Sequence, residues 1–375
     1  MAKLNIIVAD SDEEYMEALE RYFRTYYRER IESLCITSQE YLIEYMKKEI
    51  TNIDILLVTP RFLHKLNLDK VNTVVLLTDG RIPQEYIKFE SIAKYQEAQK
   101  LVRRIIDIYA ENNPDEVYTS FNDRKTKVIG VFSPDGGAGK TTISIAISLR
   151  SSQRGMNVFY LNIENIPSTQ VFLDCNSENN LSDVLYYLKE KSKNLSLKIE
   201  GARLEDLASG IHFFAPPDSP LEMNEILDND ISELVSQLKS LNRYDSIVID
   251  MSSVINEKNL KLFEICDSII CISTPDKISQ KKASQFIKAL EMTERVELKT
   301  LQVKLKFVVN KYDASCVDML ENLYGEGKVT AAKIPNRPEI YFDTGERLEI
   351  SLDNDFGESI NLLVSSIFGE NEYGS

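Results

Sequence analysis

Three glycines followed by a lysine and a threonine could bind a phosphate group in the middle of this chain. Gly136, Gly137 and Gly139 lie just ahead of Lys140 and Thr141. Glycine has no Cβ, so its backbone can turn several N–H groups toward one anion. A lysine at this spacing would contact the β- and γ-phosphates, and the threonine hydroxyl would coordinate Mg²⁺. These residues therefore predict a phosphate-binding loop with an adjoining magnesium site.

The segments on either side of the glycines can position them. Residues 128–132 are an apolar, β-branched run typical of a buried strand, and a helical pattern begins at Lys140. A helix N-terminus adds unpaired N–H groups and a positive dipole end, so Ala138 and Thr142 join the candidate nucleotide-binding residues. The alternative is a glycine turn before a core helix, but a strand, a glycine loop and a helix in this order favour a P-loop.

A second candidate for the magnesium site, this one an acid, lies further along the chain. Residues 244–250, Tyr-Asp-Ser-Ile-Val-Ile-Asp, form a strand-like run that ends in a carboxylate. In an alternating α/β chain, such a strand downstream of a P-loop has the Walker B arrangement, whose acid holds the magnesium shell. We therefore predict that Thr141 and Asp250 hold the Mg²⁺ ion together.

The glycine loop resembles that of the deviant P-loop ATPases of the MinD/ParA superfamily. Their pattern, Lys-Gly-Gly-x-Gly-Lys-Ser/Thr, is matched here from Gly136 to Thr141. The resemblance implies an α/β domain that binds ATP and magnesium and forms a nucleotide-sandwich homodimer. Two positions depart from the pattern. Pro134 stands where the usual P-loop begins with glycine, and Asp135 replaces the signature lysine of the superfamily.

The acid at Asp135 reverses the charge at a place where the resemblance implies a lysine that neutralises phosphate. At ~4 Å and an effective dielectric constant of ~20, a charge interaction amounts to about 4 kcal/mol. Losing an attraction and gaining a repulsion would disfavour the usual sandwich dimer and remove transition-state stabilisation. Lys140, Thr141 and Asp250 remain, so the sequence predicts MgATP binding with low or absent hydrolysis.

The same resemblance implies further residues of the site. Asn162 and Glu164 match the two aspartates of the phosphate-sensing switch and are the candidates for catalysis. Asn162 can orient a water molecule but cannot act as a base. For both residues, an ordinary polar pair at a strand end is the alternative. Asn310 matches the asparagine that contacts adenine, and Pro335 and Asn336 match the segment that covers the base.

The chain is long enough for two α/β domains. It has 375 residues, of which 43% are hydrophobic and 27% charged, as in soluble globular proteins. The polar, turn-rich residues 113–126 predict a linker between a domain of residues 1–112 and a P-loop domain of residues 127–375. We expect the second domain to carry helices on both faces of its sheet.

Net charge and hydropathy bear on whether the chain binds nucleic acid or a membrane. The net charge of −15 argues against nucleic-acid binding. We find no apolar run that could span a bilayer and no signal-peptide pattern, so we expect a cytoplasmic protein without direct membrane insertion.

The first domain resembles a response-regulator receiver. Its short apolar runs alternate with helical patterns, which predicts a parallel, flavodoxin-like sheet. Asp10 and Asp12 match the acidic pair of receivers, Thr78 their conserved hydroxyl and Lys94 their conserved lysine. Thr59 stands at the phosphoacceptor position, and a threonine hydroxyl cannot form an acyl-phosphate. The resemblance therefore implies a pseudo-receiver that serves docking or dimerisation.

A pseudo-receiver followed by a deviant P-loop domain resembles the TadZ/CpaE-type pilus-assembly proteins. This resemblance implies a homodimer that localises at the cell pole and recruits the machinery of a tight-adherence (type IVb) pilus secretion system. One alternative is a ParA/MinD-type partitioning or positioning switch ATPase, which the net charge and Asp135 oppose. Another is a two-component-linked regulatory ATPase, which Thr59 opposes. A plain scaffold whose P-loop binds no nucleotide is the third.

Overall fold

The chain forms two compact units in a computed structural model. The structure describes residues 3–28, 31–47, 53–80, 82–113, 126–177, 179–191, 195–292, 301, 303–313 and 330–369. Unit 1 is Met1–Asn122 with Glu190–Gly201, and unit 2 is Asp123–Lys189 with Ala202–Ser375. The predicted linker, residues 113–126, lies almost wholly outside the described residues. The sequence predicted one domain for all residues from 127 onward. In the structure, residues Glu190–Gly201 belong instead to unit 1.

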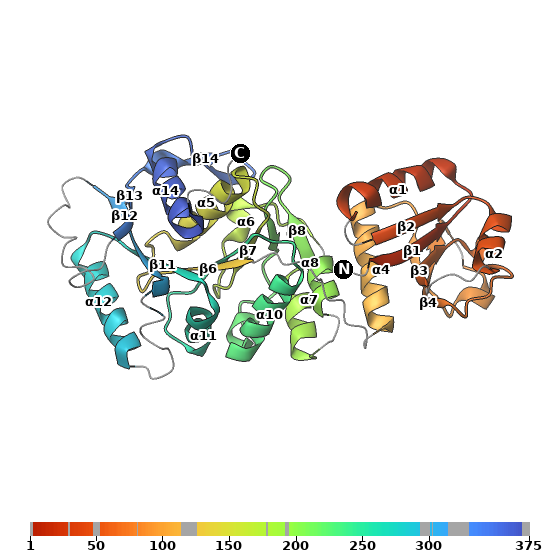
Figure 1. The fold of residues 1–375 in the computed structure, drawn as a ribbon, viewed down its shortest axis with the longest axis horizontal. Coiled ribbons are helices and arrows are strands. Elements are labelled where there is room, and N and C mark those ends of the chain that lie inside the picture. Colours follow the sequence, from red (N-terminus) through yellow and green to blue (C-terminus); the bar gives the residue numbers. More distant parts are fainter. Residues whose placement is uncertain are drawn as a thin grey trace. The chain divides into compact units, whose positions relative to one another are not determined.

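Unit 1 is built on a five-stranded parallel sheet (Figure 1). Its strands are β1 (Leu4–Ala9), β2 (Ile31–Ile36), β3 (Ile53–Val58), β4 (Val71–Thr78) and β5 (Glu90–Ala93). The order β2-β1-β3-β4-β5 is that of flavodoxin-like folds. This confirms the fold predicted for the first domain.

Helices cover both faces of this sheet because successive strand residues point to opposite sides. Ile6 and Val8 pack with α1 (Glu13–Tyr26) and α4 (Ala98–Asn112). Ile7 and Ala9 pack on the other side with α2 (Gln39–Lys47) and α3 (Pro60–Leu63). A short 3₁₀ turn, η1 (Gln84–Tyr86), precedes β5.

A late segment of the chain completes unit 1. Helix α8 (Leu195–Ala202) follows α7 of unit 2 in sequence, yet Leu197 joins the same buried cluster as α1 and α4. The Lys198 ammonium lies 3.1 Å from Asp107 Oδ1 on α4. Hydrophobic periodicity could not reveal this, because an eight-residue pattern does not specify which core it joins.

Unit 2 is built on an eight-stranded sheet with the order β13-β12-β11-β6-β10-β7-β9-β8. Its strands are β6 (Lys127–Phe132), β7 (Val158–Asn162), β8 (Arg203–Glu205), β9 (His212–Phe214), β10 (Ser246–Asp250), β11 (Ser268–Ser273), β12 (Leu305–Tyr312) and β13 (Thr330–Pro335). All neighbours are parallel except β8 and β9. A two-stranded antiparallel ribbon, β14 (Tyr341–Asp343) with β15 (Leu348–Ile350), follows η3 (Pro338–Ile340).

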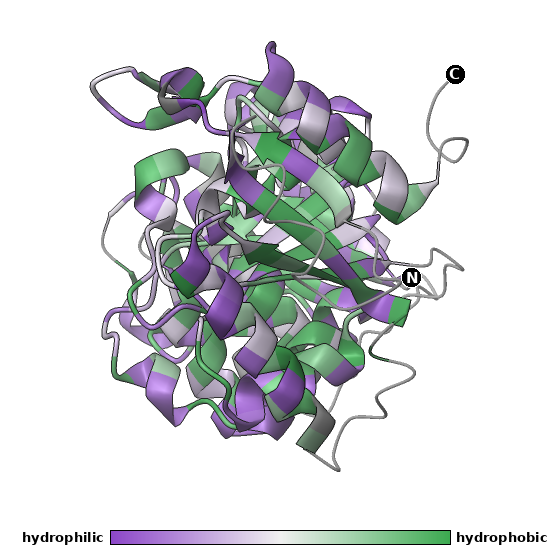
Figure 2. Cartoon of the chain, turned by 90° about the vertical axis from the view of Figure 1, so that its left-hand side faces the viewer, coloured by the Kyte–Doolittle hydropathy of each residue, from purple (hydrophilic) through white to green (hydrophobic). Residues whose placement is uncertain are grey.

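Helices flank both faces of the larger sheet, as predicted. They are α5 (Lys140–Gln153), α6 (Thr169–Phe172), α7 (Leu181–Lys189), α9 (Glu222–Glu225), α10 (Asp228–Ser240), α11 (Glu257–Ile265), α12 (Lys277–Met292) and α14 (Asp355–Phe368). Figure 2 shows that the strands between them are largely hydrophobic. No helix in the described ranges is long and apolar enough to cross a membrane.

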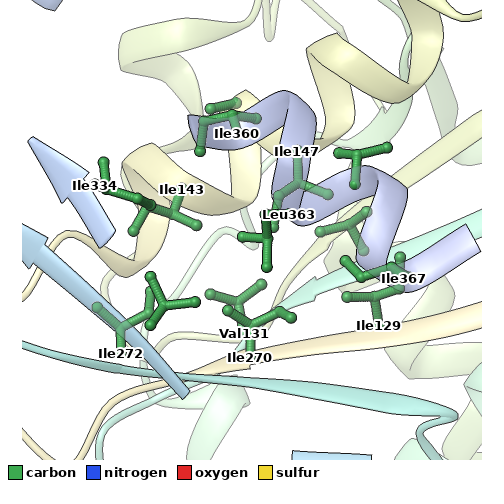
Figure 3. Packing of buried hydrophobic residues seen from close by; sticks show 14 of the residues in the cluster. Ile129, Val131, Ile143, Ile147, Ile270, Ile272, Ile334, Ile360, Leu363 and Ile367 are labelled. Carbon is green, nitrogen blue, oxygen red and sulfur yellow. The ribbon is translucent and has the colours of Figure 1, made fainter. Parts of the chain in front are cut away.

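The core on one face holds the P-loop helix in place. Ile143 and Ile147 of α5 point with Leu363 of α14 toward Ile129 and Val131 of the sheet (Figure 3). On the other face Phe132 packs against Phe263 of α11 and Phe286 of α12, with ring centroids 5.1 and 4.7 Å apart. Because both ends of the glycine loop are anchored in this core, the loop has a defined place at the edge of the sheet.

Candidate nucleotide-binding site

Three adjacent strands bring the predicted residues to one edge of the sheet. Strand β10 lies between β6 and β7, so that Asp250 is in register with both Val131 and Asn162. The glycine loop follows β6, and Glu164 follows β7. Since the carboxyl ends of parallel strands meet at one edge, residues far apart in sequence share this site.

The glycine loop has the backbone that its sequence predicts. Gly137 and Gly139 have φ values of 73° and 95°, in the left-handed region that favours glycine. At Gly139 a Cβ would lie only 2.4 Å from Asn310 Nδ2, so a side chain would also collide with strand β12. Gly139 immediately precedes helix α5, which places the helix N-terminus at the loop.

The end of strand β12 supports the loop from outside. Asn310 Nδ2 donates to the carbonyl oxygen of Ala138 at 2.8 Å, and Lys311 Nζ donates to that of Gly137 at 2.8 Å. These bonds give Asn310 a role in shaping the loop, and its contact with adenine stays a prediction. Pro335 and Asn336 lie at the end of the neighbouring strand β13, and their role in covering the base also stays a prediction.

Lys140 reaches across the edge to the loop after β7. Its ammonium lies 3.2 Å from Glu164 Oε1 and donates to Ser253 Oγ at 2.8 Å. Thr141 Oγ1 donates to Glu164 Oε2 at 3.4 Å. The two side chains that the P-loop pattern assigns to phosphate and magnesium are thus both bound to one carboxylate.

Asp250 is fully buried at the centre of the site. Its Oδ2 accepts from Tyr160 Oη at 3.1 Å and from Asn162 Nδ2 at 3.3 Å. Its Oδ1 has no hydrogen-bond partner in the described part of the chain. Burial, and then the negative charge of Glu164, raise the pKa of Asp250 to about 7.

These residues fit a magnesium nucleotide. An orphaned, buried carboxylate oxygen near the Thr141 hydroxyl is a place that a hydrated Mg²⁺ ion would satisfy. Thr141 and Asp250 would hold the ion, and Lys140 with the loop amides would hold phosphate oxygens. A bound Mg²⁺ would neutralise phosphate charge. Among the predicted catalytic candidates only Glu164 has a carboxylate, and that carboxylate is bound by Lys140.

Asp135 has a cationic partner that the sequence did not indicate. Lys282 Nζ of α12 lies 2.6 Å from Asp135 Oδ1. A cavity of about 530 Å³ adjoins this pair, lined by Asp135, Gly136, Gly137, Thr274, Pro275, Asp276, Lys277 and Lys311. The two paired residues are 147 positions apart, so no local motif could link them.

Sequence reasoning also missed three hydroxyl groups of the site. They are Ser253 beside Lys140, Tyr160 beside Asp250, and Tyr341, whose Oη lies 2.6 Å from Thr142 Oγ1. Ser253 and Tyr160 lie close in sequence to Asp250 and Asn162, which is a usable signal. Tyr341 belongs to the β14–β15 ribbon, which no periodic pattern in the sequence predicted.

Comparison with known proteins gives a matching domain model and a fold for this region. The model of an AAA domain family matches residues 126–307. MinD from Pyrococcus horikoshii OT3, solved with Mg-ADP, is 16% identical over 65% of this chain and 97% of its own, with a TM-score of 0.50. Cobyrinic acid a,c-diamide synthase from Mycobacterium smegmatis, solved with an ATP analogue and magnesium, is 15% identical over 65% and 95%, with a TM-score of 0.50.

A further solved structure resembles the chain over the same share of its length. A ParA family ATPase from Chlorobium tepidum TLS is 17% identical over 65% of this chain and 97% of its own, with a TM-score of 0.48. The search of curated proteins found no match. The Pyrococcus horikoshii and Mycobacterium smegmatis structures, at 16% and 15% identity, show a fold that this chain shares.

Proposed function

We propose that this chain is a MgATP-binding localisation scaffold with weak or no ATP hydrolysis. The observation that carries this is the Asp135–Lys282 pair. An acid stands where the superfamily resemblance implies a phosphate-neutralising lysine, and a lysine of the same chain binds it at 2.6 Å. Lys140, Thr141 and Asp250 lie at the same edge of the sheet and would bind phosphate and magnesium. Binding is therefore retained, whereas transition-state stabilisation is reduced.

Calorimetry tests this proposal directly. MgATP and MgADP are titrated into the wild-type protein and into Lys140→Ala, and phosphate release is followed in parallel. We expect micromolar binding that the substitution abolishes, with negligible release. Rapid release that depends on Lys140 would favour the switch-ATPase alternative, with Lys282 as the replacement cation. No binding at all would favour a scaffold without nucleotide.

The process that we propose is assembly of a tight-adherence type IVb pilus, with recruitment of its secretion machinery at the cell pole. The support is the order of the domains, which resembles TadZ/CpaE-type proteins, and the flavodoxin-like strand order of unit 1. In the native host, deletion of the gene should abolish surface pili, and a Lys140→Ala copy should fail to restore them. Normal piliation in the deletion strain would rule this process out.

We also propose that a second copy of the chain is a partner. Exposed apolar side chains follow the strands that flank the P-loop: Ile166 after β7, Val254 after β10 and Ile278 after β11, with exposures of 80%, 58% and 68%. Exposed apolar residues at the carboxyl edge of one sheet support a protein interface there. Light scattering should show a dimer with MgATP that Ile278→Glu converts to a monomer. A dimer unaffected by that charge would place the interface elsewhere.

A further inference from the structure

Two successive residues at the end of strand β12 bind the same loop. Asn310 Nδ2 donates to the carbonyl oxygen of Ala138 at 2.8 Å. The next residue, Lys311, donates from Nζ to the carbonyl oxygen of Gly137, also at 2.8 Å. In a regular strand, neighbouring side chains point to opposite faces and could not both reach one loop. Strand β12 therefore departs from regular geometry where it meets the glycine loop.

The backbone shows this departure at Lys311. Its φ is 56°, in the left-handed region that residues with a Cβ rarely adopt. The register of β12 against β13 also shifts between Val309 and Tyr312. Such irregularities re-aim side chains and are over-represented beside active sites, where local strain is retained. Here the irregularity brings the Lys311 side chain onto the loop that would hold the phosphates.

The bond from Lys311 to the loop prepares a surface for a base. Lys311 is an exposed residue, and its ammonium is fixed on the Gly137 carbonyl. The methylene stem between backbone and ammonium is apolar and can cover, or be covered by, a flat apolar group. A nucleotide whose phosphates lie in the glycine loop carries its base one ribose away from the loop. The Lys311 stem is within that reach.

Asp313 is the first residue after strand β12, and it is exposed. Two residues of extended chain span about 6.6 Å, so Asp313 can reach the edge of a base that lies on the Lys311 stem. A carboxylate only accepts hydrogen bonds. The Watson–Crick edge of guanine offers two adjacent donors, N1–H and the N2 amino group, whereas adenine offers the N6 amino group beside an acceptor. A carboxylate at this edge therefore favours guanine.

Resting on the nucleotide site proposed above, we infer that Asp313 recognises the base and that the site binds guanine nucleotides at least as tightly as adenine nucleotides. Lys311 supplies the surface on which the base lies. The second N–H of the Asn310 amide is suited to N7, an acceptor that both purines share, so this contact does not discriminate. Selection falls to Asp313, whose two bonds to guanine should be worth about tenfold or more in affinity.

Calorimetric titration with MgGDP, MgADP and the magnesium complex of xanthosine diphosphate tests this inference. Xanthine has a carbonyl group where guanine has the N2 amino group, so it suits an amide and repels a carboxylate. We expect Asp313→Asn to weaken MgGDP binding about tenfold and to strengthen xanthosine diphosphate binding about tenfold. MgADP affinity should change less than about twofold. A merely structural role of Asp313 would not produce the gain for xanthine.

Asp353→Asn is the matched control, because it makes the same change at another exposed acid of unit 2. It should alter none of the three affinities, and thermal melting checks that both variants fold. Wild-type protein that bound MgADP but not MgGDP would overturn the inference and leave the proposed function intact. So would equal losses for all three nucleotides in Asp313→Asn. Binding of neither MgADP nor MgGDP would overturn the proposed function, and the inference with it.

Discussion

Lys94 in unit 1 and Lys140 in unit 2 are buried to similar extents, at 6% and 8% exposure, and both contact carboxylates. Lys94 Nζ lies 2.6 Å from Asp10 and 2.9 Å from Asp12. The rings of Tyr15 and Tyr95 cover it, with centroids 4.9 and 5.1 Å away. In the part of the chain that the structure describes, Lys140 pairs with the Glu164 carboxylate, and it lies at the start of a helix beside a glycine loop.

The difference lies in what else can approach each ammonium group. Two acids balance the charge of Lys94, so an incoming anion would face repulsion from both carboxylates. Lys140 adjoins backbone N–H groups and left-handed glycines that can accept an anion. Similar burial thus accompanies a lysine shared by two acids in unit 1 and, in unit 2, a lysine beside backbone N–H groups that could receive an anion.

The largest expected effect is a difference between the Lys140 site and the Lys94 site in how stability depends on pH. The pKa of Asp250 rises from 3.8 to about 7. The folded state therefore binds this proton more tightly than the unfolded state. The resulting stabilisation is fully present below about pH 4 and is lost as the pH rises through about 7. A shift of this size corresponds to about 4 kcal/mol.

Denaturant unfolding at pH 5 and pH 8, without divalent cations or nucleotide, measures more than half of this loss in unit 2. The Asp250→Asn variant should lack that part of the pH dependence. In unit 1 the sign is opposite, because the Lys94 ammonium lowers the pKa of Asp12. That contribution disappears as the pH falls through the folded pKa of Asp12. Equal pH profiles for wild type and Asp250→Asn would contradict the prediction.

The second effect tests the structural role of Lys94. Lys94→Met leaves Asp10, which is 4% exposed, without its cation. Breaking a buried pair in this way costs about 3 kcal/mol. Hydrogen exchange across residues 3–113 should rise, while nucleotide binding by unit 2 stays as in wild type. Lys47→Met, at an exposed helix end, is the control. Unchanged exchange in Lys94→Met would mean that this cluster does not stabilise unit 1.

The third effect tests the glycine loop. Gly139→Ala forces a Cβ to within 2.4 Å of Asn310 Nδ2 and puts alanine at a φ of 95°. We expect about 2 kcal/mol of destabilisation and loss of MgADP binding. Gly80→Ala makes the same chemical change where no atom lies within 4 Å, and it should leave binding intact. Full MgADP affinity in Gly139→Ala would show that the loop adapts.

The smallest effect concerns the Asp135–Lys282 pair. The Lys282 side chain is 46% exposed, so Lys282→Met should change the free energy of unfolding by less than about 1 kcal/mol. The unpaired Asp135 would then repel phosphate and lower the MgATP affinity about threefold. Lys281→Met, which removes the adjacent exposed lysine, is the matched control. Identical affinities in the two variants would argue that Lys282 does not act on the site.

Local sequence patterns correctly predicted many of the strands and the helix that follows the glycine loop. Short apolar runs such as residues 4–9 and 246–250 are strands, and the glycine loop leads into a helix at Lys140. Each of these signals depends on neighbours within one or two turns of chain. The β14–β15 ribbon and helix α8 were missed, because their short patterns derive stability from distant partners.

The sequence by itself determined the glycine loop and the helix start at Lys140, because these are local properties, and it predicted phosphate binding by Lys140 and Thr141 from them. It also determined the acid at Asp135 and the threonine at position 59. Only the tertiary structure decided that Glu164 binds Lys140, that Lys282 binds Asp135, and that residues 195–201 belong to unit 1. These pairings depend on strand order and helix packing, which join residues that no periodicity relates.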